Sequence, residues 1–581
     1  MANQLIVGAN EMTFSDIKSN GSALVARVGS LLILAMGSLF FSGSVAHAQL
    51  DPPHLYTVSP TGVDLATGSF TTSVTDLSIG GLSLERSYVS ADGLGGWQSS
   101  DYFGYGWTHN YDIYTRQDYI HGQNSSVVMV GRTIYRFSGW PTPTTYPQGD
   151  SIGTTLATVN GAIVFTDSDG TAYRFLPGSN VKVSTITRPD GTVLTFSYVS
   201  GLPKTIVSNR GFAMVFDYSS TQVTAACGYN LAVTYVTTST TCASAALKVT
   251  YGYTAAKLTG VTDVFGNVAH YTYDGGGYLA CLTDPGTATC KVTNTHAPSR
   301  GGNAIVVTSQ TTADGANWGF ACDCGIAELA DPEDLNPEDG TSMTEPNGAT
   351  ANFSFTAGSF SYYQNENGKV YTPQYGGRIL YSLTSPEGNK VNFTYSDGAE
   401  TKRTFVGKSG SGLGNIDQAT KTYPTSCTNL IICHLPLTVT DARSALTGYT
   451  YDSIHGGVLT ETKPANSAGI SAVVRHNYAQ KYAYIKNGGG GYSAAATPVW
   501  MLIEDRTCRT TATVNGACAG GSSDEVVTAY DYGAASGPNN LLLRGVATTA
   551  DGVTRRTCFS YDWMGNKISE TKPRAGLAVC S

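Results

Sequence analysis

The stretch Asp263 to Leu279, D-V-F-G-N-V-A-H-Y-T-Y-D-G-G-G-Y-L, is the clearest structural unit in the chain. Asp263 and Gly266 frame one turn, and Asp274 and Gly277 frame a second turn eleven residues later. An aspartate that opens a turn can accept hydrogen bonds from the backbone N–H groups ahead of it, and a glycine three residues on can take a positive φ. About seven residues remain between the turns, enough for one β-strand of ~23 Å. The stretch therefore predicts a β-hairpin corner at each end of a strand.

Side chains in that strand alternate between two faces, so Ala269, Tyr271 and Tyr273 share one of them. Tyrosines at alternate positions of a strand commonly pack the sheet and keep the hydroxyl at a wet edge. We expect this packing role for Tyr271 and Tyr273, and for Tyr451 and Tyr561 in two similar segments. An aromatic platform for glycans or peptides is the alternative.

The same skeleton recurs along the chain with less regular spacing. Asp452 with Gly456 and Asp562 with Gly565 are further turn pairs. Copies of a roughly 20-residue unit are typical of stacked arrays, in which each unit buries its apolar face against its neighbours. The sequence therefore predicts an all-β protein built from many hairpins. Its expected strands include Gly191–Tyr198, Gly211–Tyr218, Asn267–Tyr273 and Asn389–Tyr395.

Composition excludes two broad classes of protein. The 581 residues carry a formal charge of −8, and only 13% of them are charged, whereas general nucleic-acid binding needs a dense basic surface. The 41% hydrophobic content is also far from that of a disordered chain. We expect an ordered protein with no nucleic-acid partner.

Residues 1–48 have the pattern of a secretory signal peptide. Lys18 and Arg27 precede the apolar run Leu31–Phe41, and Ala46–Ala48 is a small-x-small cleavage site, so the mature chain should begin at Gln49. An uncleaved membrane anchor is the alternative. No later stretch approaches the ~18 apolar residues of a transmembrane helix. We expect an exported protein without a membrane span, located in the periplasm, on the cell surface or in the medium.

All twelve cysteines lie between Cys227 and Cys580, and exported chains can keep disulfides. Connectivity does not follow from sequence. Cys322 and Cys324, two residues apart, fit either one local bridge or two longer ones. The other ten form five candidate pairs: Cys227 with Cys242, Cys281 with Cys290, Cys427 with Cys433, Cys508 with Cys518, and Cys558 with Cys580.

Searches for catalytic and metal-binding chemistry find little. The histidines show no His-Glu-x-x-His spacing, and there is no Gly-x-Ser-x-Gly elbow. Cys427, Cys433 and His434 could supply metal ligands, but a disulfide beside a histidine is the favoured interpretation for an exported chain. The acidic residues between Asp331 and Asp339 lack the spacing of a calcium loop and fit a solvated insertion. We expect no enzymatic activity, cofactor or metal.

The chain resembles the RHS/YD-repeat family. Tyr273-Asp274, with Asp263, Gly266 and Asn267 before it and Gly277 and Leu279 after it, is similar to the repeat of that family. A second and more specific match covers about residues 58–112, similar to the leader of bacterial RHS proteins. Its segments are Val63–Gly68, Asp76–Ile79, Leu84–Tyr88, Phe103–Trp107 and Asn110–Tyr111.

The resemblance implies β-hairpins wound in a spiral into a hollow shell, which in toxin-bearing members holds a variable C-terminal effector. No segment here matches the conserved core that closes the shell, and the stretch up to Ser581 does not look like an effector. Neither toxin activity nor self-cleavage is therefore assigned to any residue. The expected parts are a signal peptide (1–48), a β leader region (49–150), YD-type repeats (151–310), a Cys/acidic insertion (311–350) and degenerate repeats (351–581).

The favoured function is that of an exported, non-enzymatic scaffold, a segment of β-shell that contacts other cells, cell-surface components, other proteins or glycans. One alternative is the N-terminal part of a toxin-delivery protein whose effector lies downstream. The other is a glycan-binding adhesin that uses exposed aromatic side chains.

Overall fold

The computed structural model describes residues 58–90, 102–120, 123–139, 147–148, 152–178, 181–300, 304–324, 339–356, 359–376 and 379–580. All of them belong to the second of two compact units, Met1–His47 and Ala48–Ser581. The predicted signal peptide and Asp331 to Glu338 of the acidic insertion lie outside the described residues. Within the described residues, no helix is long and apolar enough to cross a bilayer.

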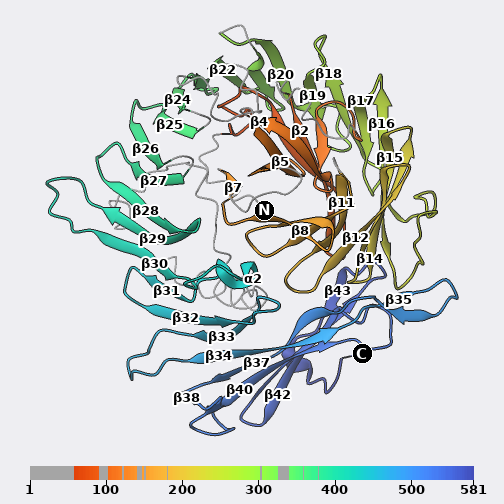
Figure 1. Ribbon diagram of the computed structural model, residues 1–581, viewed down its shortest axis with the longest axis vertical. Helices are drawn as coiled ribbons and strands as arrows, with labels where there is room; N and C mark the ends of the chain where they lie inside the picture. Colours follow the sequence, from red (N-terminus) through yellow and green to blue (C-terminus); the bar gives the residue numbers. More distant parts are fainter. Residues whose placement is uncertain are drawn as a thin grey trace, which may run out of the picture. The chain divides into compact units, whose positions relative to one another are not determined.

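The described residues are almost entirely antiparallel β-structure, which confirms the all-β prediction (Figure 1). The helical elements in that part of the chain are a single turn of α-helix, α2 (Leu430–Cys433), and a 3₁₀ turn at Pro573–Ala575. A short N-terminal sheet is formed by β1 (Thr71–Ile79), β2 (Leu82–Val89) and β3 (Trp107–His109), paired in the order β1-β2-β3. We call it the leader sheet.

Almost all other strands belong to one large sheet, in which each strand pairs with the next along the chain. Its first part contains β4 (Ile113–Ile120), β5 (Gln123–Val130), β6 (Thr133–Ser138), β7 (Pro147–Gln148), β8 (Thr155–Val159), β9 (Ala162–Thr166), β10 (Ala172–Phe175), β11 (Val181–Thr187), β12 (Val193–Val199), β13 (Leu202–Ser208), β14 (Phe212–Ser219) and β15 (Gln222–Asn230). Its second part contains β16 (Leu247–Thr254), β17 (Lys257–Thr262), β18 (Val268–Tyr273), β19 (Leu279–Thr283), β20 (Cys290–Pro298), β21 (Ile305–Thr312), β22 (Asn317–Asp323), β23 (Asp339–Thr344), β24 (Thr350–Thr356), β25 (Ser359–Gln364), β26 (Val370–Gly376), β27 (Ile379–Thr384), β28 (Lys390–Ser396) and β29 (Ala399–Val406). Its last part contains β30 (Ile416–Thr422), β31 (Thr438–Asp441), β32 (Leu446–Tyr451), β33 (Val458–Thr462), β34 (Val473–Lys481), β37 (Val499–Cys508), β40 (Glu525–Tyr532), β41 (Leu543–Ala550), β42 (Val553–Tyr561) and β43 (Lys567–Glu570).

Two features interrupt this simple order. The strand β4 pairs with β5 and also with β11, so β4 to β7 branch from the sheet. The strand β37 pairs with both β34 and β40, and the hairpins β35 (Tyr484–Lys486)–β36 (Tyr492–Ala494) and β38 (Thr513–Val514)–β39 (Ala517–Cys518) leave the sheet on either side of it. The four strands expected at the Tyr-rich segments are β12, β14, β18 and β28, and their ends lie within two residues of the expected ends.

Early hairpin turns contact much later parts of the same sheet. The Trp500 N–H donates to the Asp190 carbonyl at 2.8 Å, and Asn230 Nδ2 donates to the Trp563 carbonyl at 2.7 Å across 333 residues. His434 Nδ1 lies 2.9 Å from the Ser168 carbonyl. The hairpin turns around residues 168–231 therefore contact segments that follow roughly half a chain later.

Candidate functional site

Each predicted corner is a turn whose backbone N–H groups are bound by the aspartate that opens it. Asp263 Oδ1 accepts the N–H groups of Phe265 at 2.9 Å and Asn267 at 2.8 Å. The Gly266 N–H donates to the Asp263 carbonyl at 3.1 Å, and Gly266 has φ +87°, a conformation costly for residues with a Cβ. Burial favours the neutral acid, but the hydrogen bonds from Asn267 and Phe265 outweigh it and lower the pKa of Asp263.

The other predicted corners follow the same design with one variation in length. At Asp452 the corner is one residue longer, because the Gly456 N–H donates to the Asp452 carbonyl at 2.9 Å across four residues. Asp452 Oδ1 accepts the N–H groups of Ile454 and His455. The three-residue corners are those of Asp274 with Gly277 (φ +92°) and Asp562 with Gly565 (φ +90°).

Tyrosines at the ends of the strands have a second role that the sequence pattern did not predict. The Tyr273 hydroxyl donates to the Leu258 carbonyl of β17 at 2.9 Å, while the ladder between β18 and β19 shifts register next to Tyr273. The bulge therefore directs the ring toward the preceding strand, and the hydroxyl is hydrogen-bonded to the backbone of that strand. Burial raises the pKa of Tyr273 to about 12.

Seven tyrosines in the described part of the chain share this geometry, and we call them the anchor tyrosines. Each one lies at a bulge, and its hydroxyl donates to a backbone carbonyl on, or next to, the preceding strand of the sheet at 2.6 to 2.9 Å. Tyr451 and Tyr561, expected only to pack the strands, belong to this set. The seven are Tyr198, Tyr218, Tyr253, Tyr273, Tyr451, Tyr532 and Tyr561.

Tyr271, the fourth expected packing residue, packs against the leader sheet. Its ring lies against Trp107 with centroids 5.2 Å apart in an edge-on arrangement, and it is 3% exposed. Further hydrogen bonds join the two sheets: the Leu279 N–H donates to the Tyr88 hydroxyl at 2.9 Å, and Trp107 Nε1 donates to the Tyr273 hydroxyl at 3.1 Å. The leader sheet and this part of the large sheet thus share one hydrophobic core.

A buried ion pair lies at the centre of this interface. Arg86 binds both carboxylate oxygens of Asp76, and both side chains are almost fully buried. The Tyr251 hydroxyl donates to Asp76 Oδ2 at 2.8 Å, and Arg86 Nη2 lies 3.4 Å from the Tyr271 hydroxyl. The guanidinium carbon is 4.6 Å from the centre of the Trp107 ring, a cation–π contact.

These neighbours keep Arg86 charged despite its burial. Burial opposes the charged form, but Asp76, Tyr271 and Tyr251 outweigh it and hold the pKa of Arg86 well above its usual value. For Tyr251, burial and the Asp76 carboxylate raise the pKa well above its usual value. The polar cluster is therefore shared between the two sheets: the leader sheet supplies the ion pair, and the large sheet supplies the two tyrosines that surround it.

The structure forms all five predicted disulfides, with Cα–Cα distances of 5.0 to 5.6 Å. Cys322 is paired with Cys324, the local alternative. Because the sulfur atoms of Cys427 and Cys433 are joined to each other, they offer no thiolates to a metal. His434, 3.8 Å from Cys427 Sγ, turns its other nitrogen to the Ser168 carbonyl.

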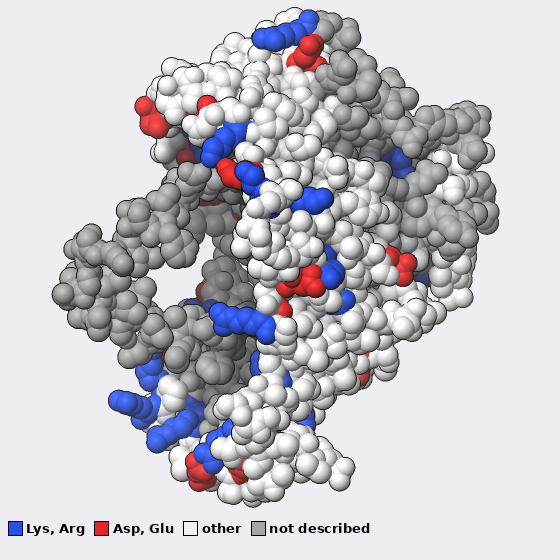
Figure 2. Space-filling model, turned by 90° about the vertical axis from the view of Figure 1, so that its left-hand side faces the viewer, with Lys and Arg blue, Asp and Glu red and all other residues white. Residues whose placement is uncertain are grey.

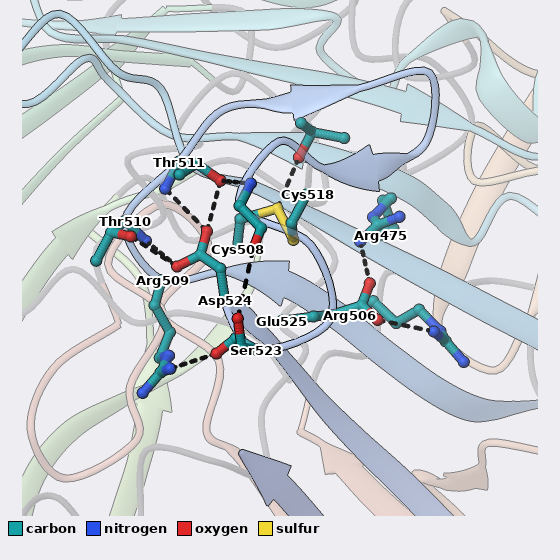
Figure 3. The surroundings of a disulfide bond; sticks show 12 residues. Arg475, Arg506, Cys508, Arg509, Thr510, Thr511, Cys518, Ser523, Asp524 and Glu525 are labelled. Atoms are coloured by element: carbon teal, nitrogen blue, oxygen red, sulfur yellow. Dashed lines mark hydrogen bonds and ion pairs between the residues drawn. A yellow bond between two sulfur atoms is a disulfide. The ribbon is translucent and has the colours of Figure 1, made fainter. Parts of the chain in front are cut away.

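The disulfide between Cys508 and Cys518 closes a small hairpin that depends on one carboxylate (Figure 3). Asp524 Oδ1 accepts the N–H and the hydroxyl of Thr510 at 2.9 and 2.7 Å, and Oδ2 accepts the same groups of Thr511 at 3.0 and 2.5 Å. These bonds, with the Thr511 hydroxyl as the largest cause, lower the pKa of Asp524 to about 2. The sequence pattern did not single out Asp524, since it shows no corner glycine spacing.

Comparison with known protein families matches one segment of the chain. Residues 61–131 match the family described as "Domain of unknown function (DUF6531)", a segment that covers the leader sheet. No curated protein matches the chain.

Two solved structures match most of this chain at low similarity. The "Crystal Structure of TcdB2-TccC3 without hypervariable C-terminal region" has a TM-score of 0.35 and 9% identity over 86% of this chain and 27% of that chain. A Photorhabdus luminescens Tc holotoxin pore has a TM-score of 0.26 and 10% identity over 86% of this chain and 27% of that chain. This chain thus spans less than a third of the length of those proteins.

The turn geometry predicts different costs for two glycines of one corner. Gly277 has φ +92°, whereas Gly275 does not lie in the left-handed region and has open space where a Cβ would project. We expect Gly277→Val to lower the free energy of unfolding by at least ~1 kcal/mol through backbone strain. Gly275→Val is the matched control with a smaller effect. Urea titrations that give equal midpoints for the Gly277→Val variant and the parent would refute the turn assignment.

The buried ion pair predicts a non-additive pair of substitutions. Asp76→Leu leaves Arg86 buried without a counter-charge, Arg86→Met leaves Asp76 in the same position, and we expect each to cost ~3–5 kcal/mol of unfolding free energy. The double variant Arg86→Met with Asp76→Leu removes both charges and should be closer to the parent than either single variant. Denaturant titrations of the four proteins measure this coupling. A double variant as unstable as the sum of its singles would show that the pair is not coupled.

The hairpin of Asp524 predicts an acid-dependent contribution to stability. Because its pKa is lower in the folded chain, Asp524 stabilises the fold above its ordinary pKa of 3.8, and the contribution is lost as the pH falls toward about 2. The difference in melting temperature between the parent and Asp524→Asn should therefore shrink across this range. Asp284→Asn, which alters an exposed ion pair with Lys291, should differ little from the parent at any pH. A gap for Asp524→Asn that does not change with pH would contradict the assignment.

Proposed function

We propose that this chain is an exported, non-enzymatic scaffold of the RHS/YD type, whose large sheet presents an extended surface to other macromolecules. The main support for the proposal is that potentially reactive side chains are repeatedly hydrogen-bonded to the backbone and so have structural roles. The corner carboxylates bind backbone N–H groups, and the anchor tyrosines bind backbone carbonyls. Groups held in this way are poor candidates for nucleophiles or general bases, because their lone pairs or protons are already bound.

Two further observations support the scaffold. The family match at residues 61–131 falls on the segment whose motifs resemble the RHS leader. In the described part of the chain, that segment is packed into the core of the large sheet rather than left as a separate domain.

The surface is compatible with protein, cell-surface or glycan partners rather than nucleic acid. On the face shown in Figure 2, acidic and basic side chains are interspersed over a mainly uncharged surface. Many of the charges form ion pairs between strands of the sheet, such as Lys402 with Asp417 on adjacent strands and Arg475 with Glu525 on either side of β37. Paired charges of this kind do not create the basic tract that binds phosphate backbones.

Toxin delivery is the second candidate function. It is favoured by the leader, because the resemblance extends to family members that hold an effector inside their shell. In that case the same sheet would enclose a toxic segment, and the partner would be this cargo rather than another cell. The two roles differ in what is bound and not in how the sheet is built.

Two properties test the proposal: cleavage and export of the chain, and binding of the purified protein to cells and glycans. Expressed in a bacterium that secretes by signal peptides, the full chain is expected to lose residues 1–48 and to appear outside the cytoplasm with Gln49 as its first residue. A variant with Ala46→Leu and Ala48→Leu should remain unprocessed. The purified chain is then incubated with intact cells and a glycan array. Saturable binding to cells supports the scaffold, whereas unprocessed cytoplasmic protein, or purified protein that binds no cell, would contradict it.

A further inference from the structure

His109, on the last strand of the leader sheet, is buried without a polar partner. It is 2% exposed, and neither of its ring nitrogens has a hydrogen-bond partner among the described residues. Its ring is enclosed by aromatic rings, with centroid distances of 5.8 Å to Tyr102, 5.3 Å to Phe103 and 6.2 Å to Phe216. Phe216 belongs to β14, so His109 lies at the contact between the leader sheet and the large sheet.

Two basic side chains act on the surroundings of His109, one from its own sheet and one from the large sheet. Arg86 is its direct partner in the antiparallel pairing of β2 with β3, so both side chains project to the same face. Lys182 of β11 approaches from the large sheet, where its Nζ binds the Tyr102 hydroxyl and the Gly201 carbonyl. A proton on His109 would add a third positive charge to this group.

The carboxylates of the region are bound to other groups. Asp76 of β1 is held by Arg86 and by the hydroxyl of Tyr251 from β16. Asp112, which follows β3, accepts the Thr108 hydroxyl at 3.4 Å and favours the charged form of Lys182. Neither carboxylate is hydrogen-bonded to the ring of His109. A protonated His109 would therefore have no hydrogen-bonded carboxylate to compensate its charge inside the core.

We propose that His109 is an acid-sensitive latch, and that protonation of its ring releases the leader sheet from the large sheet. When the leader sheet separates, His109 reaches water and the charge is solvated. Separation would also expose apolar side chains of the large sheet that the leader sheet now covers, among them Phe216, Tyr251 and Tyr271. Acidification would thus convert a closed interface into an exposed one without any change in covalent structure.

The direction of the pH dependence follows from the two states of the histidine. Burial, with a smaller effect of Lys182, lowers the pKa of His109 to about 3 in the docked state, and the released ring has its ordinary value of 6.5. The released state therefore binds more protons between these values, and docking weakens as the pH falls from 6.5 toward 3. One such group changes the docking equilibrium by about tenfold per pH unit, or on the order of 100-fold between about pH 7 and about pH 4.5.

Hydrogen exchange resolved by segment, on the mature chain with its disulfides intact, tests the latch. At about pH 4.5, after correction for intrinsic exchange rates, β2 and β3 should open on the order of 100-fold more often than at about pH 7, while β24 to β29 keep their protection. In His109→Phe, which fills the same aromatic cage without a titrating group, the increase for β2 and β3 should be absent. The control His270→Gln changes an exposed histidine of β18 and should behave like the parent.

Equal acid responses of the parent and His109→Phe would overturn the proposal, as would a loss of protection that is the same in the leader sheet and in β24 to β29. His109→Leu provides a second variant should His109→Phe fail to fold. It is apolar and has no titrating group, so β2 and β3 should show no acid-specific opening. An acid response of His109→Leu equal to that of the parent would also contradict the latch.

Discussion

Hydrogen bonds to the backbone at the hairpin corners are the interaction on which the rest of the structure depends. Every reversal of the chain leaves N–H groups without ladder partners, and a long array of hairpins multiplies that problem. Asp263, Asp274 and Asp562 meet it with a carboxylate that binds two N–H groups of its own turn, next to a glycine of positive φ. Because each corner is complete in itself, hairpins can be added in series without help from distant parts of the chain.

The anchor tyrosines and the leader sheet add the longer-range order that the corners lack. Each anchor hydroxyl ties a strand to its predecessor at a bulge, so strand pairing and ring packing fix the same register. The leader sheet then covers the large sheet with Trp107 and Tyr88, and with the ion pair of Arg86 and Asp76. A buried ion pair contributes little net stability, yet it strongly disfavours any docking in which one partner is left alone. Arg86 therefore favours the single position of the leader sheet in which its charge is paired.

Local chemistry explains what could be predicted from the sequence. The corners, the all-β class and the five disulfide pairs depend on residues close together in the chain, such as Asp274 with Gly277 or Cys281 with Cys290. The hydrogen bond from the Tyr273 hydroxyl to the Leu258 carbonyl depends on a β-bulge. The alternation of apolar and polar residues in the sequence does not reveal where such a bulge occurs.

The polar cluster of the leader was beyond sequence reasoning for a different reason. Arg86 and Asp76 are ten residues apart, and their tyrosine partners on β16 and β18 come from much later in the chain. The motif that contains Arg86 indicates only that it belongs to a leader. Nothing in it indicates a buried charge, because burial is decided by the packing of the two sheets. The burial of His109 depends on the same packing and has no sequence signal either.

Amide hydrogen exchange at the corner residues of the intact chain, at neutral pH, measures most directly whether carboxylates hold the backbone N–H groups of the corners. If carboxylates hold the corners, the amides of Asn267, Gly276 and Asn566 should exchange as slowly as those of the adjoining strands, although they lie in exposed turns. Exchange of these amides at the rate of an unstructured chain, with the strands still protected, would contradict the account.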